Sequence, residues 1–154
     1  MKTKTIGLTL ALSVAAAAMC FANNPTLGTW KLNENKSTFG DGAGKSMLVV
    51  WEKVGHQDKC TVDGTDAQGN KTHSVWTGKL DGKFYPVTGD PQADQRSFKV
   101  NGENTIDMVT HKHGKIVGDG TIVVAEDGKT RTVTNTMTNA KGEKVTSTLA
   151  YDKS

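Results

Sequence analysis

The chain of 154 residues is long enough for one domain of ordinary size, and its formal net charge is only +3. Without the first 22 residues, which hold Lys2 and Lys4, it would have 17 basic and 16 acidic side chains and a net charge of +1. A chain so close to neutral does not bind nucleic acid or lipid through net charge, and we expect no nucleic-acid partner.

Residues 1–22 have the pattern of a signal peptide. Lys2 and Lys4 precede a short apolar run over 6–18, and Cys20 and Ala22 place small residues at positions −3 and −1 of a cleavage site. The run is too short for a permanent membrane anchor, so we expect no integral membrane segment after its removal. The sequence therefore predicts a signal peptide over 1–22, a mature domain over 23–154, and a periplasmic or secreted protein.

Cysteine usage agrees with export. If cleavage follows Ala22, Cys60 is the one cysteine of the mature chain, so no internal disulfide can form. The alternative is a lipoprotein in which Cys20 becomes the acylated first residue. Met19 fits that alternative poorly, because a small residue normally precedes a lipidated cysteine.

Beyond the signal, runs of Val, Thr, Ile and aromatic residues alternate with short turns that contain glycine. The turn markers recur every 12 to 14 residues, with one interval of 20, and are Val54-Gly55, Gln68-Gly69, Asp81-Gly82, Asn101-Gly102, His113-Gly114, Asp127-Gly128 and Lys141-Gly142. This rhythm indicates strands of about eight to ten residues joined by hairpin turns, in which glycine adopts positive φ. We predict an all-β fold, a single up-and-down antiparallel β-barrel of nine or ten strands, because closure removes exposed strand edges.

The first and last predicted strands carry short motifs. Residues 27–32 read Leu-Gly-Thr-Trp-Lys-Leu, residues 36–39 read Lys-Ser-Thr-Phe, and residues 151–153 read Tyr-Asp-Lys. These motifs resemble the calycin superfamily, in which lipocalins carry Gly-x-Trp on the first strand and fatty-acid-binding proteins end near Tyr-x-Lys. The chain most closely resembles the exported bacterial lipocalin-like proteins. That resemblance implies a barrel that holds a small hydrophobic molecule.

Two features depart from the pattern of these families. Lipocalins usually cover the first-strand tryptophan with an arginine near the last strand, whereas the C-terminal end of this chain offers only Lys153. Fatty-acid-binding proteins insert a helical lid after the first strand, and residues 33–44 are too few and too rich in glycine to form one.

The three tryptophans are candidates for the barrel interior. We expect Trp30 to plug the closed end, where a large ring fills the space between the strands. Trp51 shares a strand face with Met47 and Val49, and Trp76 shares one with Leu80. Two roles fit Trp51 and Trp76: packing in the core, or lining a ligand cavity.

The segment 130–138 has threonine at every even position and places Arg131, Val133, Asn135 and Met137 on the opposite face. If the threonines face solvent, these four residues face the interior. An interior arginine could hold a ligand carboxylate through two parallel hydrogen bonds, and Asn135 would add a donor. Resemblance to fatty-acid-binding proteins implies the same use of a cavity arginine. In the alternative interpretation, Arg131 reaches solvent near the strand end.

Other chemistry has little support in the sequence. His111 and His113 are spaced to present two imidazoles from one strand, but a zinc site needs three or four ligands, and we expect solvated histidines and no metal. No Gly-x-Ser-x-Gly nucleophile motif is present, and Cys60 has the neighbours of a small core residue. We therefore expect no cofactor and no enzymatic activity.

The sequence thus predicts an exported lipocalin-like protein that holds a small hydrophobic or fatty-acid-like ligand inside a barrel. The predicted ligand-binding residues are Arg131, Asn135, Met137, Val133, Trp51 and Trp76. The alternative is a filled barrel that acts as a structural or interaction protein without a small-molecule ligand. The low number of bulky residues (three Phe, three Trp and two Tyr after the signal) favours a cavity, whereas three tryptophans on inner faces would fill it.

Overall fold

The computed structural model describes residues 24–154, so the predicted signal peptide over 1–22 and its cleavage site lie outside the described residues. The described part contains strands and no helix. The ten strands are β1 (Gly28–Thr38), β2 (Lys45–Val54), β3 (Gln57–Thr65), β4 (Lys71–Gly78), β5 (Asp81–Thr88), β6 (Gln95–Val100), β7 (Thr105–Lys112), β8 (Lys115–Val124), β9 (Thr130–Thr138) and β10 (Lys144–Lys153).

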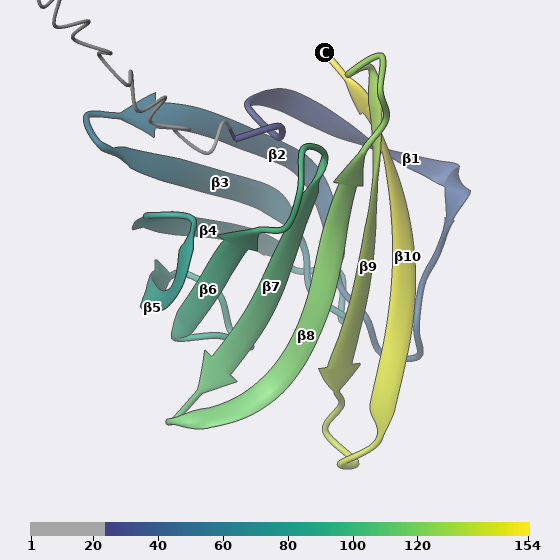
Figure 1. Ribbon diagram of the computed structural model, residues 1–154. Helices are drawn as coiled ribbons and strands as arrows, with labels where there is room; N and C mark the ends of the chain where they lie inside the picture. Colours follow the sequence, from purple (N-terminus) through teal and green to yellow (C-terminus); the bar gives the residue numbers. More distant parts are fainter. Residues whose placement is uncertain (1–23) are drawn as a thin grey trace, which may run out of the picture.

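Each strand pairs antiparallel with the next one in the sequence, and β1 pairs with β10 to close the barrel (Figure 1). The prediction of an up-and-down antiparallel barrel is confirmed, with ten strands. The hairpin turns follow the glycine markers: His113 and Gly114, with φ of 50° and 72°, form the two-residue connection between β7 and β8. Asp81-Gly82 is the exception, because both residues lie inside β5.

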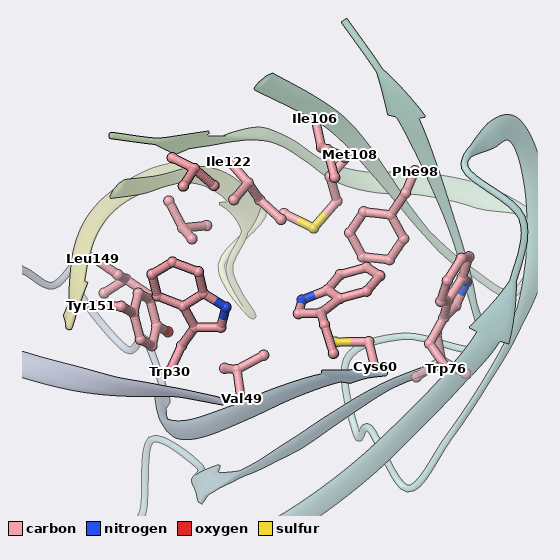
Figure 2. Close-up of a cluster of buried hydrophobic side chains, with 14 of the residues drawn as sticks. Trp30, Val49, Cys60, Trp76, Phe98, Ile106, Met108, Ile122, Leu149 and Tyr151 are labelled. Carbon is pink, nitrogen blue, oxygen red and sulfur yellow. The ribbon is translucent and has the colours of Figure 1, made fainter. Parts of the chain in front are cut away.

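The middle of the barrel is filled by aromatic rings. Trp51 and Trp76 are each 2% exposed, and their ring centroids lie 5.0 Å and 4.8 Å from that of Phe98. Figure 2 shows Phe98 and Trp76 on one side of the buried cluster and Trp30 beside Tyr151 on the other. The low content of bulky residues therefore does not leave the middle of the barrel open, because all three tryptophans point inward.

One end of the barrel is closed by the N-terminal segment 24–27. The Asn24 side chain donates to the Asp58 carboxylate at 2.9 Å, and Thr26 donates to Asn24 through both its backbone N–H and its hydroxyl. The Trp30 indole N–H donates to the Thr26 carbonyl at 2.7 Å, and Trp30 is 0% exposed. Trp30 thus occupies the closed end, as predicted.

The Lys-Ser-x-Phe motif stabilises an irregularity in β1. The register between β1 and β10 shifts between Asn33 and Thr38, so the residues in between lose their ladder partners. The Ser37 hydroxyl replaces part of that ladder by donating to the Asn33 carbonyl and accepting from the Ala150 N–H, at 2.7 Å and 2.9 Å. Phe39, two residues further on, packs against the core.

Candidate functional site

The inner face of β9 carries the polar residues that the sequence singled out. Arg131 is 3% exposed, and its guanidinium carbon lies 4.8 Å from the Trp30 ring centroid and 4.7 Å from that of Tyr151. These distances are in the range of cation–π contacts. Arg131 therefore lies inside the barrel near its closed end, and the alternative in which it reaches solvent is wrong.

Two cations lie over the Trp30 ring. Arg131 covers it from β9, and the Lys153 ammonium lies 5.2 Å from the same ring. The sequence offered Lys153 for this place but gave no sign that Arg131 reaches the same ring. The ladder between β9 and β10 places Arg131 directly opposite Tyr151, and that register is a tertiary property.

The residues around Arg131 do not satisfy all the hydrogen-bond donors of its guanidinium. Its Nε and Nη1 atoms are buried and have no hydrogen-bond partner among the described residues. Burial lowers the pKa of Arg131 to about 10, whereas it raises the pKa values of Tyr151 and Cys60 to about 12. All three shifts follow from a weakly polar interior that disfavours the charged form of each group.

The second arginine of the chain shows the contrast. Arg96 also lies on an inner face, on β6, but its guanidinium is satisfied. Its Nη2 atom donates to the Asp90 carboxylate at 3.1 Å, and its Nε donates to the Thr110 hydroxyl at 3.2 Å. Unpartnered donors are thus a particular property of Arg131.

Asn135 adds an unsatisfied acceptor to the same strand face. Its Oδ1 atom is buried without a hydrogen-bond partner in the part of the chain that the structure describes. Asn135 pairs with Ser147 on β10 and with Gly120 on β8, so small residues flank it on both sides. It lies four residues from Arg131, which corresponds to about 13 Å along a strand.

Two methionines occupy the interior next to Asn135. A Cβ added to Gly118 would overlap the Met137 sulfur, and one added to Gly120 would lie 3.2 Å from the Met108 methyl carbon. Gly118, on β8, a strand that curves strongly in Figure 1, therefore leaves space for Met137, and Gly120 allows the β9 backbone at Thr134 to approach closely, with Met108 beside it. Methionine side chains are flexible and adapt readily to new neighbours, so this part of the interior can rearrange.

The structure does not bring the six predicted site residues together in one hollow. Arg131 and Val133 lie toward the closed end, Trp51 and Trp76 belong to the central ring cluster, and Asn135 and Met137 follow further along β9. Two hollows of about 440 and 370 Å³ are lined by other residues, the first at β1 and the C-terminal end, the second across β7, β8 and β9.

The two histidines considered as metal ligands have other partners. The His111 ring stacks on Phe84, with centroids 3.7 Å apart and planes 13° apart. His113 lies in the β7–β8 turn, where its backbone N–H donates to the Asp94 carboxylate at 2.7 Å. Within residues 24–154, no three His, Cys, Asp or Glu side chains form a group that could hold a metal ion.

Sequence reasoning missed the partners that surround Arg131 and Asn135. Tyr151 was noted only as part of a C-terminal motif, although it packs on the guanidinium and donates its hydroxyl to the Ser46 carbonyl at 3.0 Å. Gly118 and Gly120 were available as a signal, because glycines two residues apart leave one face of a strand without side chains.

Comparisons with known proteins identify no family for this chain. No protein-family profile matches the chain, and no curated protein is similar to it. Among solved structures, a redesigned β-barrel, mFAP1, bound to DFHBI, has 16% sequence identity and a TM-score of 0.43, covering 81% of this chain and 94% of that chain. So distant a likeness carries no argument about a ligand. No helix long and apolar enough to cross a membrane is present in residues 24–154.

Proposed function

We propose that this chain is an exported lipocalin-like binding protein without enzymatic activity, whose barrel holds a small, largely apolar acid. One observation carries the proposal: Arg131 Nε, Arg131 Nη1 and Asn135 Oδ1 are buried on the inner face of β9 without hydrogen-bond partners. A ligand in the interior would supply the missing acceptor and donor.

The energetic argument starts from the cost of these atoms. A buried polar group without a partner costs about 1–3 kcal/mol, and a charged group costs more. The Trp30 and Tyr151 rings offset part of the cost for Arg131, but neither accepts a hydrogen bond from Nε or Nη1. A ligand carboxylate would satisfy these donors with charge-assisted hydrogen bonds.

The neighbouring interior suits the rest of such a ligand. Val133 and Leu149 lie between the level of Arg131 and that of Asn135, and both are buried. Met108 and Met137 fill the space beside the glycines of β8 and can move aside. A molecule that contacts both Arg131 and Asn135 would need to be about 13 Å long, which favours a chain-like acid.

The proposed function includes a periplasmic or secreted location. The signal pattern over 1–22 favours a periplasmic or secreted location, where a soluble barrel can carry an apolar molecule through water. N-terminal sequencing of the protein from cells should find Asn23 first. Retention of Met1 on a cytosolic protein would contradict the location, and a start at an acylated Cys20 would establish a lipoprotein.

Ligand titration tests the binding itself. We expect wild type to bind a fluorescent fatty acid, and Arg131→Gln to weaken that binding by about 1.5–3 kcal/mol, the usual contribution of a hydrogen bond to a charged group. The methyl ester of the same probe should bind both proteins alike. Lys153→Gln is the matched control, because it removes the other cation over Trp30 and leaves the buried donors in place.

The filled barrel is the competing function, and the central ring cluster favours it. Trp51, Trp76 and Phe98 occupy the middle of the interior with ring centroids 4.8–5.8 Å apart. If wild type binds no probe, and native mass spectrometry of the exported protein finds no co-purified molecule, the filled barrel is the better description.

A further inference from the structure

The barrel has one weak seam, between β4 and β5. On its other side β4 pairs with β3 through all eight of its residues, from Lys71 to Gly78. Toward β5 only two residue pairs form, Val75 with Thr88 and Trp76 with Val87. We call this region the β4–β5 seam. Backbone hydrogen bonds therefore contribute little to its closure.

The ring of Tyr85 covers Gly78, just beyond the last paired residues. A Cβ added to Gly78 would overlap the Tyr85 ring, so the ring lies over the face of β4 that Gly78 leaves without a side chain. Pro86, between Tyr85 and the paired Val87, has no N–H to extend the ladder. The Tyr85 ring meets Trp76 edge-on, with centroids 5.9 Å apart and planes at 87°. Tyr85 is only half-buried, whereas Trp76, which its ring contacts, is 2% exposed.

Three side-chain hydrogen bonds hold the seam closed. The Thr88 hydroxyl donates to the Val75 carbonyl at 3.4 Å, beside the two residue pairs. The Tyr85 hydroxyl donates to the Asp81 carboxylate at 3.0 Å, which keeps the ring against Gly78. The Trp76 indole N–H donates to the Arg96 carbonyl at 2.9 Å, and this bond joins β4 to β6 across β5. Rotation of one side chain, together with the loss of one exposed hydrogen bond, would open the seam to the ring cluster.

The two ends of the barrel are held by other contacts. Segment 24–27 and buried hydrogen bonds seal one end. At the opposite end, the Gly40 N–H donates to the Ser147 hydroxyl and the Asp94 N–H donates to the His111 carbonyl, so the β1–β2 and β5–β6 loops are bonded to the wall. Within residues 24–154, no other pair of neighbouring strands has as few paired residues as the β4–β5 seam.

From this geometry we infer that Tyr85 is the gate of a lateral opening at the β4–β5 seam, through which a ligand reaches the interior. This inference rests on the proposed function. Behind the gate lie Trp76 and then Phe98 and Trp51, and a passage lined by ring edges and a glycine suits a slender or planar apolar molecule.

Hydrogen exchange of the indole N–H groups tests the gate without any ligand. The Trp76 and Trp30 indoles both donate to backbone carbonyls, the first behind the gate and the second at the closed end. In wild type we expect the Trp76 indole to exchange at least about tenfold faster than that of Trp30, because the seam opens locally. NMR resolves the three indole signals, and Trp→Phe variants assign them.

Three variants make the test specific to the seam. Tyr85→Ala should speed exchange at Trp76 by a further factor of about ten, and Tyr85→Phe and Asp81→Ala, which keep the ring and remove its hydrogen bond, by about threefold. None should change exchange at Trp30. If Tyr85→Ala does not fold, the other two variants decide the question. Equal exchange at both indoles, or changes in exchange at Trp30 as large as those at Trp76, would overturn the gate.

Binding kinetics separate the gate from the proposed function. With the fluorescent fatty acid, Tyr85→Ala should raise the association and dissociation rates by a similar factor and leave the dissociation constant within about threefold. Unchanged rates in a protein that binds the probe would overturn the gate alone. If wild type binds no probe, the proposed function fails, and Tyr85 is then not a gate for a ligand. This holds even if hydrogen exchange shows that the seam opens.

Discussion

The closed end and the β4–β5 seam are both lined by tryptophan, but they are closed by different means. At the closed end, Trp30 and Thr26 are 0% exposed and their polar groups are hydrogen-bonded within segment 24–27. At the seam, strand pairing is limited to two residue pairs, and a half-buried tyrosine ring covers Gly78 beyond them. Both regions belong to one barrel, but buried hydrogen bonds of segment 24–27 close the first, whereas a partly exposed side chain covers the second.

The difference shows how one fold can be rigid at one place and open at another. Local opening costs least where few apolar contacts and few protected hydrogen bonds must break. Arg131 belongs to the rigid region, so its unpartnered donors are held in a fixed position. We therefore expect ligand recognition near the closed end and ligand passage at the seam.

Removal of the tryptophan at the closed end should have the largest effect. Trp30→Ala should lower the free energy of unfolding by about 3–5 kcal/mol, because it leaves a cavity beside Arg131 and Tyr151. Urea denaturation measures the loss. Tyr85→Ala, at the seam, is the matched variant and should cost only about 1 kcal/mol. Similar losses for the two variants would remove the contrast between the regions.

A methyl group at the seam should have an intermediate effect. In Gly78→Ala the new Cβ meets the Tyr85 ring and lies 2.8 Å from Trp76 Cζ2, so crowding should cost about 1–3 kcal/mol. In the Tyr85→Ala background the same substitution should cost clearly less, because the ring that it meets is gone. A double-mutant cycle measured by denaturation gives this coupling. Purely additive effects would show that Tyr85 does not fill the seam.

The pKa values of the two tyrosines distinguish the closed end from the seam, and this test has the smallest expected effect. Tyr151, near the closed end, has its pKa raised to about 12 by burial. Desolvation and the hydrogen bond to Asp81 also raise the pKa of Tyr85, at the seam, but less. Absorbance titration should show two steps, and Tyr85→Phe should remove the one at lower pH. If Tyr151→Phe removes that step instead, Tyr151 has the lower pKa and the expected order of the two tyrosines is wrong.

Much of the fold was predictable because its signals are local. Strand period and turn glycines depend on residues close together in the sequence, and they predicted the barrel and its ten strands within one. Threonine at every even position of β9 placed Arg131 on the opposite face, but the sequence left open whether Arg131 faces the interior or reaches solvent, and its burial decided the question. Among the turn markers only Asp81-Gly82 was misplaced, because β4 ends at Gly78 and β5 begins at Asp81, so Lys79 and Leu80 form the connection.

The site was less predictable because its contacts are between strands. Two cations lie over Trp30, Lys153 and Arg131, and the local sequence gave no sign of the second, which is 101 residues away from Trp30. Counting bulky residues favoured a cavity, but the count could not say that the three rings of the central cluster meet. The paucity of pairs in the β4–β5 seam has one local signal, Pro86, which lies next to the last paired residue Val87 and has no N–H to donate to β4.

The sequence by itself determined the strands, their order and the two faces of β9, because alternation and turn chemistry act within a few residues. Tertiary structure decided which of these faces points inward and which contacts form: the rings on either side of Arg131, the methionines beside the glycines of β8, and Tyr85 over Gly78. The physical reason is that packing and hydrogen-bond satisfaction depend on the register and curvature of the closed sheet, which arise only when all ten strands come together.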